Sequence, residues 1–169
     1  MLGMDTESVL DPPSSQMLPT PPTLTLRYIS LPTPLPGPDP STVHRVVSEG
    51  MTAPCRRCLH DARPGEEVDL IAYDPFPANS VTPYRGIGPI FVHTHECPLF
   101  EGDSIPETQL KRLMSLRGYD DKHMMVAADV TEGYQLEDVS KAMLADEEVR
   151  YIMVHNAKHG CFAFKIERA

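Results

Sequence analysis

Two histidines and a cysteine stand at alternate positions after an apolar run, in "PIFVHTHECPLF". They are His93, His95 and Cys97. Alternate residues of a strand point to one face, about 6.5–7 Å apart, so His93 and His95 are predicted to grip a single metal ion. With a third ligand from His123 or His155 and a bound water, the pair would form the zinc centre of a hydrolase.

A second pair of metal-ligand residues lies earlier in the chain. Cys55 and Cys58 have the spacing of a zinc knuckle, in which a backbone turn brings two thiolates to one ion. Cys97, together with His93 or His95, would complete a structural Cys3His zinc site. In the alternative interpretation Cys58 and Cys97 are small buried hydrophobic residues.

The C-terminal stretch "HNAKHGC" offers thiol chemistry. His155 and Cys161 flank a short loop and are candidates for a catalytic pair, with Asn156 or His159 orienting the imidazole. The same residues are also typical of a tight turn, because Asn and Gly adopt positive φ readily. In that interpretation Cys161 only packs in a sheet.

Arginines near predicted strand ends suggest an anion site. Arg56, Arg85 and Arg117 are candidates to bind a carboxylate or phosphate, and Tyr84 would add a hydroxyl group. The alternative is that these arginines form surface ion pairs in an acidic protein.

Charge and composition exclude several classes of protein. The chain has 169 residues, with 15 basic against 24 acidic side chains and a net charge of −9. This balance disfavours binding to nucleic acid or to an anionic membrane surface. No apolar run approaches the roughly 20 residues of a membrane helix, and the start lacks a secretory signal. We expect an intracellular, cytoplasmic protein whose cysteines are thiols or metal ligands.

Proline divides the chain into two parts. Ten of the 18 prolines fall in the first 40 residues, so residues 1–23 are predicted to be a disordered, proline-rich leader. Such a leader could dock on a partner that binds Pro-rich motifs. Residues 24–169 are predicted to form a single domain with its own core.

The predicted domain is α+β, with a mostly antiparallel or mixed sheet and one main helix near the C-terminus. Alternating apolar residues predict strands, and helical spacing predicts the helix at about 134–146. The strand at 89–95 is apolar on both faces and is predicted to be central in its sheet. In the final hairpin one face is predicted to carry Ile152, Val154, Phe162, Phe164 and Ile166. The other predicted strands lie at 24–30 and 42–49, within a hairpin at 53–76, and at 151–155 and 161–166. Residues 110–130 are predicted to form two strands or a helix-to-strand transition, broken at 119–121.

Three blocks of sequence carry a family resemblance: "PCRRCLHDARPGEEVDLIAYDPF", "PYRGIGPIFVH" and "VHNAKHGCFAFKIERA". They resemble the family called domain of unknown function 1203, mostly bacterial proteins of similar length. The likeness runs from about residue 24 to residue 169. The resemblance implies a single compact domain with an added leader, and it implies no activity, cofactor or catalytic residue.

These observations predict a small binding module for an anionic small molecule or another unknown ligand. Two further functions stay open: an enzyme, either a His-x-His metal hydrolase or a Cys/His thiol enzyme, and a zinc-stabilised or Pro-rich interaction adaptor. The sequence leaves undecided whether the chain catalyses a reaction.

Overall fold

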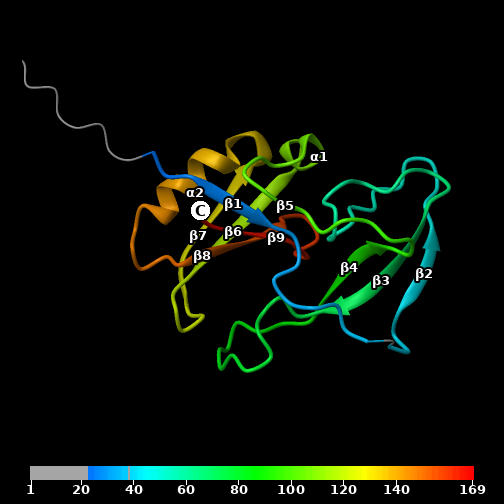
Figure 1. Cartoon of the computed structure of the whole chain (residues 1–169), viewed down its shortest axis with the longest axis horizontal. Helices are drawn as coiled ribbons and strands as arrows, with labels where there is room; N and C mark the ends of the chain where they lie inside the picture. The colour runs from blue at the N-terminus through cyan, green and yellow to red at the C-terminus, as the bar shows by residue number, and fades with distance from the viewer. Residues whose placement is uncertain (1–22, 38) are drawn as a thin grey trace, which may run out of the picture.

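The computed structural model describes residues 23–37 and 39–169 and consists of two antiparallel sheets and one main helix (Figure 1). The prediction of an α+β fold with a helix late in the chain is therefore confirmed. The predicted proline-rich leader falls, apart from its last residue, outside the described residues.

The larger sheet has six strands, and every neighbouring pair is antiparallel. The central pair is the C-terminal hairpin, and the first strand of the chain pairs with one side of it. In spatial order the strands are β5 (Glu101–Gly102), β1 (Leu26–Ile29), β9 (Phe162–Arg168), β8 (Tyr151–Asn156), β6 (Leu113–Tyr119) and β7 (Met125–Glu132).

The smaller sheet has three strands in the order β2 (Val43–Val46), β3 (Glu67–Tyr73) and β4 (Gly88–His93). The prediction that the strand at 89–95 is central was wrong, because β4 lies at an edge and β3 is central. The apolar residues on both faces of β4 have another cause. Ile90 and Val92 pack in one buried cluster, whereas Phe91 packs against another.

The main helix covers one face of the six-stranded sheet (Figure 1). A short 3-10 turn, η1 (Gly133–Gln135), leads into α2 (Leu136–Leu144), and α1 (Glu107–Leu110) is a single helical turn. The helix buries Leu136 and Leu144, two turns apart, and exposes acidic residues in its first turn, where they favour the helix dipole.

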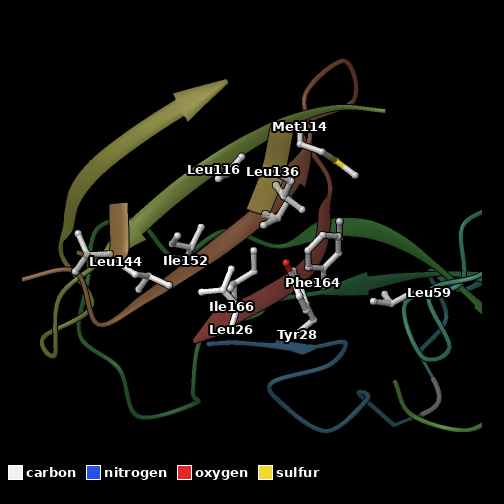
Figure 2. Close-up of a cluster of buried hydrophobic side chains, with 13 residues drawn as sticks. Leu26, Tyr28, Leu59, Met114, Leu116, Leu136, Leu144, Ile152, Phe164 and Ile166 are labelled. Atoms are coloured by element: carbon white, nitrogen blue, oxygen red, sulfur yellow. The ribbon is translucent and has the colours of Figure 1, made fainter. Parts of the chain in front are cut away.

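Figure 2 shows the main core, which fills the space between α2 and the sheet. Leu116, Ile152, Phe164 and Ile166 are completely buried there. The ring of Tyr28 on β1 meets that of Phe164 edge-on, with centroids 6.1 Å apart. Each such side chain contributes about 1.5–3 kcal/mol through burial, so this cluster is the main source of stability.

The opposite face of the same sheet packs against the smaller sheet. Met153 and Phe162 lie there in a cluster with Tyr73 and Ile90. The prediction that Phe162 shares a face with Phe164 and Ile152 was wrong. A β-bulge between Val154 and His155 shifts the register, so that Phe162 changes faces.

No helix of residues 23–37 and 39–169 combines the length and the apolar character needed to cross a membrane.

Candidate functional site

Four of the candidate metal ligands converge at one point of the fold. The sulfur atoms of Cys55, Cys58 and Cys97 and a ring nitrogen of His93 all lie within 4.8 Å of one another. The three cysteines are buried, and the His93 side chain is only 6% exposed. The cluster therefore has the ligand set and spacing of a closed Cys3His site.

A tight turn presents the first two cysteines. The backbone N–H of Leu59 donates to the carbonyl of Cys55, and the N–H of Cys55 donates to the carbonyl of His60. Leu59 closes this turn with φ of 60°, a left-handed conformation that costs a non-glycine residue about 1–2 kcal/mol. Its side chain is buried in the main core, and that burial offsets the strain.

The third and fourth ligands come from the end of β4. Cys55 pairs with Phe91 in an isolated parallel bridge, which places the knuckle beside this strand. His93 is the last residue of β4, and the chain then bends, so that Cys97 returns to the cluster. The Cys55 and Cys97 sulfurs are 3.8 Å apart.

Hydrogen bonds concentrate on the sulfur of Cys55. The backbone N–H groups of Arg57 and His93 each donate to it at 3.4 Å. The Cys58 thiol, followed by backbone donors, lowers the pKa of Cys55 to about 4 and has its own pKa raised in turn. Burial raises the pKa of Cys97. The two backbone donors therefore favour negative charge on the Cys55 sulfur.

The other histidines lie in different surroundings. The ring of His95 lies at a tilt beside that of His93 with centroids 4.5 Å apart, and Glu66 is the third member of a more open group with these two. His123 hydrogen-bonds the Tyr151 hydroxyl at 2.7 Å, and His155 packs edge-on against Phe162. Among the described residues, the side chain that joins the His-x-His pair is thus a carboxylate, and the predicted third ligands His123 and His155 lie outside this group.

A cleft lies next to the cysteine cluster, where the two sheets meet. It comprises two adjoining hollows of about 270 and 390 Å³ that share four lining residues. Leu70, Pro89 and Phe91 form an apolar wall on the smaller sheet. The shared lining residues are Thr52, Arg112, Asn156 and His159.

The cleft is basic although the protein is acidic. Its lining carries the cationic side chains of Arg56, Arg112, Lys111 and Lys158 and a single carboxylate, that of Asp61. Charges concentrated in a concave surface act on a ligand more strongly than charges spread over a convex surface.

Arg56 is the most unusual residue of the cleft, because its guanidinium is buried and is not ion-paired. The residue is 2% exposed. It donates to the carbonyl oxygens of Phe162, at 2.7 Å, and Pro54, and its Nη2 lies 3.0 Å from the sulfur of Cys161. Among the described residues no carboxylate forms an ion pair with it. Burial, and to a lesser degree Arg112, lowers its pKa.

Arg112 supplies the second guanidinium. Its Nη2 donates to both carboxylate oxygens of Asp61 at 2.5 and 2.7 Å, which fixes the side chain. Its Nη1 is buried and has no hydrogen-bond partner among the described residues. The sequence gives no signal for this residue, because "LKRLMS" carries no recognisable motif.

The remaining candidates for an anion site do not join Arg56. Arg85 pairs with Asp74 at 2.8 Å and lines a separate hollow. Tyr84 is exposed and packs edge-on against Tyr119. Arg117 lies on β6 of the large sheet and does not line either hollow of the cleft.

The Cys161 thiol is half-buried and opens into the cleft. Besides Arg56, its sulfur has the side-chain amide of Asn156 at 3.6 Å. The nearest polar partners of Cys161 are therefore an arginine and an asparagine. His155 is buried, its Nδ1 has no hydrogen-bond partner among the described residues, and burial lowers its pKa to about 4.

The fold and the site define a small α+β domain with a Cys/His cluster beside a basic cleft. A family model described as "Protein of unknown function (DUF1203)" matches residues 52–168, and the chain belongs to this family. The matched region contains the cluster and the cleft. Neither the curated proteins nor the solved structures include a match to the chain.

Proposed function

We propose that the chain is a binding domain for a small anionic molecule, which it holds in the cleft beside Arg56 and Arg112. The observation that carries this proposal is the buried Arg56 guanidinium without a carboxylate partner. A buried charge is expensive unless an opposite charge balances it. A bound carboxylate or phosphate would provide that charge.

The neighbouring groups support the same ligand chemistry. Arg112 lines the cleft, and its buried Nη1 has no hydrogen-bond partner among the described residues. An anion between Arg56 and Arg112 would also relieve the repulsion between the two guanidinium groups. Thr52 and Asn156 add neutral polar contacts, and Phe91 gives an apolar surface for the rest of the molecule.

The test is an NMR titration of isotope-labelled protein with inorganic phosphate and with acetate. Binding in the cleft predicts saturable shifts at the backbone amides of residues 156–161 and around Arg112. Arg112→Gln is expected to weaken binding about tenfold or more, since a hydrogen bond to a charged group contributes about 1.5–3 kcal/mol.

The matched control is Arg85→Gln, which removes an arginine from the other hollow. It is expected to leave the affinity unchanged. Because Arg112→Gln also breaks the pair with Asp61, Lys158→Gln in the exposed turn serves as a second variant. Shifts scattered over the whole surface, or an affinity that neither cleft variant changes, would rule out the proposal.

A thiol enzyme is the second candidate, favoured by the contact between Cys161 and Arg56. The sulfur is accessible from the cleft, and a guanidinium at 3.0 Å stabilises negative charge on it. In this version the anionic ligand is a substrate held next to a nucleophile, and Arg56 rather than His155 polarises the sulfur.

A further inference from the structure

We infer that Cys55, Cys58, Cys97 and the Nδ1 atom of His93 bind one zinc ion in a closed structural site. This inference is independent of the proposed function, because it concerns the cluster and not the cleft. Three thiolates and one imidazole are a ligand set of structural zinc sites.

The measured spacings fit a single tetrahedral ion. Zinc–sulfur bonds of about 2.3 Å place two sulfurs about 3.8 Å apart, and a sulfur and a ring nitrogen about 3.6 Å apart. The Cys55 and Cys97 sulfurs are 3.8 Å apart. The Cys58 sulfur and Nδ1 of His93 are 3.7 Å apart. The distance between the Cys55 and Cys97 sulfurs is also far too long for a disulfide, whose sulfurs lie about 2.05 Å apart.

The surroundings of the ligands match those of a metal centre. Two backbone N–H groups already donate to the Cys55 sulfur, as is expected around a thiolate that carries negative charge. Nε2 of His93 faces a carboxylate oxygen of Glu66 at 3.6 Å. A carboxylate behind a metal-bound imidazole selects the tautomer that leaves the other nitrogen free for the metal.

The site is closed on all sides by protein ligands, which assigns it a structural role. Its four ligands fill a tetrahedron and leave no position for a reacting water. The ion would join the knuckle at 55–60, the end of β4 and the loop before β5. Arg56 lies between the first two ligands, so the zinc also fixes the backbone that carries the main cation of the cleft.

The experiment is elemental mass spectrometry on the full-length chain purified from zinc-supplemented culture. We expect about one zinc per chain in the wild type and almost none in Cys97→Ser and His93→Ala. His95→Ala is the matched control, since it changes a neighbouring histidine outside the Cys3His set. It is expected to keep its zinc.

Cobalt replacement covers the case in which the ligand variants do not fold. The wild-type chain, stripped of zinc and reloaded with Co²⁺, is expected to show the sulfur-to-cobalt charge-transfer band and the strong visible bands of a tetrahedral thiolate site. A chelator is expected to lower its melting temperature. Zinc lost equally from His95→Ala and Glu66→Gln would overturn the inference in favour of a Glu66, His93 and His95 site. A wild type without zinc and without the cobalt spectrum would overturn it altogether.

Discussion

Nη2 of Arg56 lies 3.0 Å from the sulfur of Cys161, although 105 positions separate the two residues. The contact joins the turn at 55–60 to the residue just before β9. It brings the buried cation of the cleft to the thiol that opens into the same space. A guanidinium this close stabilises the sulfur when it carries negative charge, and that interaction can be measured as reactivity.

We therefore predict that Cys161 is alkylated before the other three cysteines. It is half-buried, whereas Cys55, Cys58 and Cys97 are buried. Arg56→Gln is expected to slow the reaction with iodoacetamide about tenfold, through loss of a hydrogen bond from a charged donor. Peptide mass spectrometry at a series of reaction times measures the rate for each cysteine.

Two variants separate a specific effect from misfolding. Asn156→Ala removes the weaker donor at 3.6 Å and is expected to slow labelling less than Arg56→Gln does. Arg85→Gln changes a distant arginine and is expected to have no effect. If His155→Gln slowed labelling as much as Arg56→Gln, the predicted His155 and Cys161 pair would be the better description of the site.

Alternation of apolar residues predicts most of the strands, and helical spacing predicts the main helix, because both are local patterns. The β-bulge at Val154 and His155 could not be predicted in this way. It depends on how two strands pair across a hairpin, and it changes the face on which Phe162 lies. The edge position of β4 could not be predicted either. Other parts of the chain cover both of its faces, so its sequence is as apolar as that of a central strand.

The candidate site was predictable where its residues are close in sequence. The spacing of Cys55 and Cys58 indicates a knuckle by itself, and His93 and Cys97 follow one apolar run. The choice of His93 over His95 depends on where the chain bends after β4. The cleft depends on tertiary packing, because Arg112 joins Arg56 only when α1 packs near the C-terminal hairpin.

Gly133, at the start of η1, packs directly against the backbone of α1, so a substitution there tests how tightly α1 is held. A Cβ added to Gly133 would lie 2.4 Å from the carbonyl oxygen of Gln109 and 2.7 Å from that of Leu110. Its backbone N–H donates to the carbonyl of Arg112 at 2.7 Å. We predict that Gly133→Ala lowers the free energy of unfolding by about 1–3 kcal/mol, because the backbone must move.

Urea unfolding followed by circular dichroism measures this effect. The control is Gly86→Ala, where an added Cβ meets nothing within 4 Å. The shift of the backbone at Arg112 is also expected to weaken phosphate binding in Gly133→Ala. Equal free energies of unfolding for the two variants would show that the backbone of α1 moves away from the added Cβ without loss of stability.

The main core gives a second prediction of stability. Phe164 is completely buried between α2 and the sheet and contacts the ring of Tyr28. Phe164→Ala is expected to lower the free energy of unfolding by about 3–5 kcal/mol, because it removes apolar contacts and leaves a cavity. Val81 is 93% exposed, and Val81→Ala is expected to stay within about 0.5 kcal/mol of wild type in the same urea experiment.

The buried His155 predicts a dependence of stability on pH. Burial, followed by the charge of Arg117, lowers its pKa to about 4, whereas in the unfolded chain its value is near the ordinary 6.5. Between these values the unfolded state binds more protons than the folded state, so the free energy of unfolding falls as the pH falls. The loss from this residue amounts to about 3 kcal/mol at about pH 4.

His155→Gln removes the titrating group while keeping a polar side chain at this position. Relative to its own stability near pH 7, the variant is expected to lose about 3 kcal/mol less than the wild type on acidification to about pH 4. Urea unfolding of both proteins at several pH values measures the difference, and other titrating groups cancel in the comparison. Parallel stability curves for the two proteins would mean that His155 is protonated in the folded state as readily as in the unfolded chain.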